Sequence, residues 1–131
     1  MAHAETLQEP LKWPISHEDR ERAVKALIEA YGGIYEASQA QKKTAFDIIS
    51  CEDPDLDPKL QSGAFYKDGT QELSFGLSQI HLPAHPDISK EQAEDPDFAI
   101  DFLMKNITQG NAKIWTCYRL IKAGKYIPDS G

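Results

Sequence analysis

The chain has 131 residues, and its 14 Lys and Arg are outnumbered by 21 Asp and Glu, which gives a formal net charge of −7 at pH 7. This length fits one domain around a single hydrophobic core. The basic residues are scattered, so the sequence lacks the positive patch expected of a nucleic-acid binder or of a protein that attaches to an anionic membrane. No apolar run approaches the roughly 20 residues of a membrane span. We predict no cofactor and leave the oligomeric state open.

The composition along the chain divides it into three parts. Residues 1–15 resemble a leader or linker, residues 16–124 form one domain, and residues 125–131 form a tail. The N-terminus lacks the charged head and apolar body of a signal peptide.

Two helices are predicted in the first half. Ser16 is suited to cap a helix whose apolar residues recur at helical spacing until Gly32-Gly33. A second helix is expected from Ser38 to Cys51. Its inward stripe continues to Glu52, and Pro54 then forbids further helix. Glu52 therefore stands at a helix C-terminus.

Turn residues replace the helical period between Pro54 and His81. Asp68-Gly69 lies between segments rich in aromatic and apolar residues, which predicts a small β-hairpin around residues 64–76. A short helix is expected from Ser89 to Ala93, where Ser89-Lys90-Glu91-Gln92 has the pattern of a capping box.

The last part of the chain predicts two more helices. One spans Asp97 to Thr108, and the other spans Ala112 to Ala123 with Asn111 as its cap. The expected fold class is mainly α, with about five to six helices and one small hairpin.

Glu52 is the candidate acid. Partial burial favours its neutral form, and the negative end of the preceding helix opposes its ionisation. A carboxylic acid that stays protonated near neutral pH is suited to protonating a glycosidic oxygen. The alternative is an ordinary exposed glutamate in an acidic loop.

Several residues are candidates to line a sugar-binding groove. Gly76 allows close approach of the backbone, and the Gln79 amide suits sugar hydroxyl or acetamido groups. Phe75, Trp115 and Tyr118 offer aromatic faces for sugar rings. The structural alternative for Gly76 is a strand glycine beside core residues. For Phe75 and Trp115 the alternative is a place in the hydrophobic core.

Other chemistries are less well supported. His81, His85 and Asp87 are potential metal ligands, but Pro83 prevents the two histidines from sharing a helical face, so we predict no metal site. Cys51 and Cys117 permit one disulfide or two buried thiols. Nothing local marks either thiol as an activated nucleophile.

The order of several motifs resembles the soluble lytic transglycosylase domain, a family with the goose-type lysozyme-like α+β fold. The resemblance covers roughly residues 34–121. It rests on Cys51-Glu52, Asp57-Pro58, Asp68-Gly69-Thr70, the segment from Ser74 to Ile80, and Trp115-Thr116-Cys117-Tyr118. Asp53 replaces the usual Ser after the glutamate, and Ser78 replaces a common Met.

The resemblance implies roles for particular residues. Glu52 would be the single catalytic acid and base, and Tyr118 would approach it. The substrate groove would be shaped by Ser74, Phe75, Gly76, Leu77, Gln79 and Trp115. Related sequences also make a disulfide between Cys51 and Cys117 more attractive.

The implied activity is cleavage of the peptidoglycan bond between N-acetylmuramic acid (MurNAc) and N-acetylglucosamine (GlcNAc), which leaves a 1,6-anhydro ring. One alternative is a hydrolytic lysozyme in which Asp53, Asp55, Asp57 or Asp68 directs water. A second alternative is a glycan-binding or phage structural module that has lost turnover. The replacement of the usual Ser by Asp53 motivates this alternative. The implied location is the periplasm or cell wall, or delivery by a phage.

Overall fold

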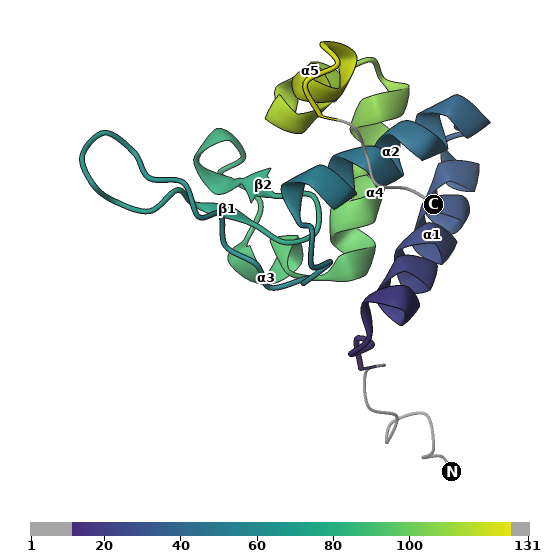
Figure 1. The fold of residues 1–131 in the computed structure, drawn as a ribbon, viewed down its shortest axis with the longest axis horizontal. Coiled ribbons are helices and arrows are strands. Elements are labelled where there is room, and N and C mark those ends of the chain that lie inside the picture. The colour runs from purple at the N-terminus through teal and green to yellow at the C-terminus, as the bar shows by residue number, and fades with distance from the viewer. Residues whose placement is uncertain (1–11, 127–131) are drawn as a thin grey trace.

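The computed structural model describes residues 12–126, and within them it is mainly helical with one small antiparallel sheet (Figure 1). Five α-helices occur in this part of the chain: α1 (His17–Ile34), α2 (Gln39–Glu52), α3 (Lys90–Ala93), α4 (Pro96–Thr108) and α5 (Thr116–Lys122). The sheet consists of β1 (Ser74–Phe75) and β2 (Ile80–His81). The predicted fold class is therefore confirmed.

Helices α1, α2 and α4 form the body of the molecule. Helix α4 packs against α1, α2 and α3, while α5 packs on α2 (Figure 1). The main core contains fully buried aliphatic residues from all three body helices, among them Val24, Ile48, Ile49, Ile100 and Leu103. No helix within residues 12–126 is long and apolar enough to cross a membrane.

Local sequence signals account for where the first two helices begin and end. The Ser16 hydroxyl accepts a hydrogen bond from the Asp19 amide at the start of α1, as predicted. Ser38 and Gln41 form a full capping box at the start of α2. We expected helix α1 to stop at the Gly32-Gly33 pair, but it continues through both glycines to Ile34. Gly32 is buried and lies against the Lys42 side chain.

The sheet is made by different residues from those expected to pair. The Asp68-Gly69 turn is present, but the segments on its two sides are joined by an isolated bridge between Phe65 and Gln71 and by a few backbone hydrogen bonds, not by a ladder. The ladder instead joins Ser74 to His81 and Phe75 to Ile80, across a tight turn within the glycine segment. Residues 62–72 consequently form an arm that extends away from the helices, at the left of Figure 1.

The expected helix from Ala112 to Ala123 is broken in two. A 3-10 turn, η3 (Ala112–Ile114), is followed by extended Trp115 and then by α5. The Asn111 side chain makes no capping hydrogen bond, contrary to our prediction. The break occurs because Trp115 is buried and its indole nitrogen donates to the Ser78 carbonyl at 2.7 Å.

Part of the predicted leader packs on the domain. Trp13 contacts the main core, and its indole nitrogen donates to the Leu56 carbonyl at 2.8 Å. The Arg20 guanidinium holds the same region together by donating to the carbonyls of Pro14 and Asp55. Residues 1–11 of that leader and residues 127–131 of the predicted tail lie outside the described part of the chain.

Candidate functional site

A groove of about 400 Å³ lies between the end of α2, the small sheet and the start of α5. Its wall combines carboxylate, imidazole, hydroxyl and aromatic side chains. The lining residues are Glu52, Glu72, Ser74, Gln79, Ile80, His81, Ala84, His85, Phe102, Ile114, Trp115 and Thr116. A hollow of this size and mixed polarity is typical of a site that binds a small molecule or part of a longer ligand.

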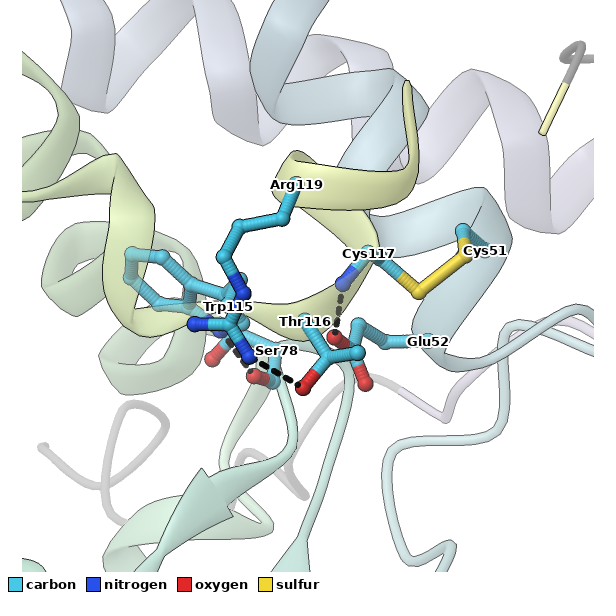
Figure 2. The surroundings of a disulfide bond; sticks show 7 residues. All are labelled: Cys51, Glu52, Ser78, Trp115, Thr116, Cys117 and Arg119. Atoms are coloured by element: carbon cyan, nitrogen blue, oxygen red, sulfur yellow. Dashed lines mark hydrogen bonds between the residues drawn. A yellow bond between two sulfur atoms is a disulfide. The ribbon is translucent and has the colours of Figure 1, made fainter. Parts of the chain in front are cut away.

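Glu52 is the last residue of α2 and lines this groove. Its Oε2 accepts a hydrogen bond from the Cys117 backbone N–H in the first turn of α5, with a donor–acceptor distance of 3.3 Å (Figure 2). The carboxyl is partly buried, so one side is held by the protein and the other faces the groove.

The surroundings of Glu52 favour its protonated form. Burial raises the pKa of Glu52 above its usual value, and the Cys117 N–H opposes this change by stabilising the carboxylate. The negative charge of Glu72 raises the pKa further, whereas the Arg119 guanidinium lowers it. Burial is the largest of these effects, so the surroundings shift Glu52 toward its protonated form, which is the form that donates a proton.

A disulfide joins Cys51 to Cys117, as the resemblance suggested. The Cα atoms lie 5.9 Å apart, and the bridge ties the last turn of α2 to the first turn of α5 (Figure 2). The residues beside the two cysteines are Glu52 and the Trp115-Thr116 pair that lines the groove. The bridge therefore holds the candidate acid against the amide that contacts it.

The glycine segment of residues 74–80 is mainly a structural element behind the groove. Gly76 has φ +86°, and a Cβ there would lie 2.0 Å from the Ala93 carbonyl oxygen. Its N–H donates to the Leu60 carbonyl at 2.9 Å. Glycine is thus required for close packing of the segment against α3.

Its neighbours divide between core and groove. Leu77 is fully buried in the main core, and Phe75 packs with Ile80 and Ala93 in a second, smaller cluster. Ser78 is fully buried and donates its hydroxyl proton to the Ala99 carbonyl. Gln79 lines the groove, but its amide already donates to the carbonyls of Leu60 and Gly76.

The wall formed by the sheet carries polar side chains. Ser74 and His81 are directly paired, and the Ser74 hydroxyl lies 3.0 Å from His81 Nδ1. Glu72, two residues before Ser74, lines the same groove. The aromatic wall consists of His85, Phe102 and Trp115, which make successive edge-to-face contacts at centroid distances of 5.1 and 5.9 Å.

The structure brings only part of the expected set together. Glu52, Ser74, Gln79 and Trp115 line the groove, whereas Phe75, Gly76 and Leu77 lie behind it. Tyr118 lies outside this groove and lines a separate hollow with residues of α2 and the end of α4. The break at Trp115 explains this position, because it changes the direction in which the α5 side chains project.

Asp53 does not act in the groove. Its side chain is fully buried, with Oδ1 accepting from the Asp57 N–H at 3.0 Å and Oδ2 without a partner among the described residues. Burial raises the pKa of Asp53 to about 7, opposed first by the Asp57 N–H and reinforced by the charges of Asp57 and Asp55. Asp53 is not among the groups that shift the pKa of Glu52.

None of the four aspartates considered as a second carboxylate lines the groove. Among residues 12–126, the acidic residue that joins Glu52 there is Glu72, which we had not selected. Its position two residues before Ser74 on an extended segment was the available signal, because residues i and i+2 share one face of a strand. Phe102 was also missed, since its spacing within α4 is that of an ordinary core residue.

Within residues 12–126, no group of three or more His, Cys, Asp or Glu side chains is arranged to hold a metal ion. His81 and His85 line the groove as imidazole groups, and Asp87 is exposed outside it.

Comparison of the chain with models of protein families, with curated proteins and with solved structures found no match.

Proposed function

We propose that this protein is a peptidoglycan lytic transglycosylase in which Glu52 is the catalytic acid and base. The observation that carries the proposal is the position of Glu52, at the end of α2 in a groove of about 400 Å³, with burial raising its pKa. This environment suits a general acid. The motif order that resembles soluble lytic transglycosylases supplies the substrate class.

In the proposed reaction, Glu52 donates its proton to the oxygen that links MurNAc to GlcNAc. The bond between that oxygen and C1 of MurNAc breaks, which leaves positive charge on the sugar ring. The 6-hydroxyl of the same MurNAc then bonds to C1, and its proton returns to Glu52. No water is consumed, and the product is a 1,6-anhydro ring.

The groove walls support binding of a glycan strand. The aromatic series of His85, Phe102 and Trp115 provides apolar surface of the kind that packs on sugar rings. On the sheet side, Ser74, His81 and Glu72 supply groups that hydrogen-bond to hydroxyls.

The disulfide supports an extracytoplasmic location. Disulfides persist in oxidising compartments and are rare in the cytosol. We therefore propose that the protein acts in the periplasm or cell wall, or reaches the wall by phage delivery.

A hydrolytic lysozyme is the second candidate, and one observation favours it. Glu72 shares the groove with Glu52, and a second carboxylate is what a hydrolase uses to direct water. The hypothesis of a glycan-binding module without cleavage rested on Asp53. Because the Asp53 side chain lies outside the groove, we favour cleavage.

The test uses purified peptidoglycan and mass spectrometry of the released muropeptides. Wild-type protein should release products with 1,6-anhydro ends, and Glu52→Gln should lower the rate by at least about 10²-fold, because it cannot donate a proton. Glu91→Gln is the matched control, since Glu91 is exposed on α3 away from the groove.

Circular dichroism and thermal unfolding should show that Glu52→Gln keeps the fold. Products with reducing ends would identify a hydrolase instead. Undiminished cleavage by folded Glu52→Gln would remove Glu52 as the acid.

A further inference from the structure

We propose that Glu72 is a second functional carboxylate of the groove, whose negative charge stabilises the positive sugar ring formed when the glycosidic bond breaks. This inference rests on the proposed function and adds a residue to it. It requires that Glu72 be placed in the groove by the fold, that its carboxylate be available, and that it act on the same centre as Glu52.

The fold determines the position of Glu72 through its backbone. Its N–H donates to the Ala64 carbonyl at 2.8 Å, and its carbonyl accepts from the Gln61 amide at 3.1 Å. Glu72 and Ser74 both line the groove, while the intervening Leu73 is exposed. This alternation is that of an extended strand, so the Glu72 side chain projects to the same side as Ser74.

The Glu72 carboxylate is available for a ligand. Among residues 12–126 it has no hydrogen-bond or ion-pair partner, in contrast to Asp47, whose Oδ2 is paired with Lys43 at 2.8 Å. Glu72 is half-buried, so its charge is only partly screened by solvent.

Glu72 acts electrostatically on Glu52. Both carboxyl groups line the same groove, and the negative charge of Glu72 adds to burial in raising the pKa of Glu52. The other titratable and charged groups around Glu52 are His81 and His85 on the groove wall and Arg119 on α5. Arg119 opposes Glu72, but its guanidinium is held by the Lys113 carbonyl and the Thr116 hydroxyl.

The same charge assists both stages of the proposed reaction. Before cleavage, it favours the protonated form of Glu52, which is the form that donates. During cleavage, a cationic ring between two carboxylates is stabilised more strongly than the neutral substrate, which lowers the barrier.

The experiment compares wild-type, Glu72→Gln, Glu72→Asp and Glu91→Gln proteins on purified peptidoglycan. Glu72→Gln keeps the size of the side chain and removes its charge. We expect its kcat to fall about 10²-fold with little change in KM, as for loss of one electrostatic contact in a transition state. Glu72→Asp should retain more activity than Glu72→Gln, and Glu91→Gln should match wild-type protein.

A second measurement does not depend on activity. Carbon-13 NMR titration of the Glu52 carboxyl should give a lower pKa in Glu72→Gln than in wild-type protein, and the alkaline limb of the pH–rate profile should move to lower pH. A merely structural role for Glu72 would produce neither change.

The outcomes separate this inference from the function on which it rests. Wild-type cleavage that needs Glu52 but is unchanged in Glu72→Gln, with an unchanged Glu52 pKa, would reject the role of Glu72 alone. Reducing-end products that disappear in Glu72→Gln would show that Glu72 directs water, and would overturn charge stabilisation as its role. Absence of any wild-type cleavage would reject both proposals.

Discussion

Glu52 and Asp53 are consecutive acids whose side chains have opposite environments. Glu52 ends α2 and faces the groove, whereas Asp53 leaves the helix with φ −141° and buries its carboxyl behind the loop of residues 54–57. The position at which the chain departs from the lytic transglycosylases that it resembles therefore belongs to the interior, and its effect should appear in stability.

Asp53 should make stability depend on pH. Its pKa is about 7 in the folded protein, above the usual value of 3.8, so the folded state binds more protons between these values. The free energy of unfolding should fall as the pH rises from about 4 to about 7, by an amount of up to about 4 kcal/mol.

Asp53→Asn should remove most of this pH dependence. Urea unfolding at pH 4.5 and pH 8 measures it, with exposed Asp87→Asn as the control, because Asp87 is not among the groups that shift the pKa of Asp53. Equal pH dependence in wild-type and Asp53→Asn proteins would contradict the assigned environment.

At the scale of elements, two local departures from regular structure build the groove. Trp115 interrupts what would be one helix, and this creates the N-terminal turn whose Cys117 amide contacts Glu52. Gly76 allows the segment after β1 to lie against the Ala93 carbonyl, which places Gln79 and Ile80 at the groove wall.

Two glycines with similar positive φ angles provide a matched test of this packing. Gly76 and Gly69 have φ of +86° and +91°, but a Cβ at Gly69 would meet nothing within 4 Å. Gly69→Ala should cost about 1–2 kcal/mol for the left-handed backbone alone.

Gly76→Ala carries the same backbone cost and a clash with the Ala93 carbonyl, so we expect a loss of about 3 kcal/mol or more. Chemical denaturation measures both variants. Similar losses in the two would show that close packing at Gly76 is unimportant.

At the scale of the whole molecule, the groove lies where two hydrophobic clusters meet. The main cluster belongs to the helices, and the smaller one is formed by Phe75, Ile80 and Ala93. Phe102 packs against both clusters and also lines the groove. The site therefore depends on how the helical body and the sheet are held together.

The disulfide acts on the whole chain because it closes a loop between residues separated by 66 positions. Closing so long a loop restricts the unfolded chain, so replacing both cysteines with Ala should lower the free energy of unfolding by about 2–4 kcal/mol. Denaturant unfolding of the double variant and of wild-type protein measures this difference.

A thiol assay of denatured, non-reduced wild-type protein should find no free cysteine. Two free thiols would contradict the bridge. Activity should also fall in the double variant, because the contact between Cys117 and Glu52 is no longer held by a covalent link.

The sequence predicted the elements whose signals are local. The caps predicted at Ser16 and Ser89 are present, because a capping hydrogen bond involves residues only three apart, whereas the cap predicted at Asn111 is absent. The sheet register and the break at Trp115 were not predicted. They depend on contacts between residues that are far apart in the sequence. Trp115 contacts Ser78, and Gly76 contacts Ala93.

The sequence by itself determined the helical character of the protein, the position of Glu52 at a helix end and the availability of one cysteine pair. The tertiary structure decided which residues share the groove with Glu52. It brought in Glu72 and Phe102, and it placed Tyr118 and Asp53 outside. The physical reason is that periodicity and capping report the direction of a side chain relative to its own helix or strand. Which side chains meet is determined by packing between segments, and no single segment encodes that.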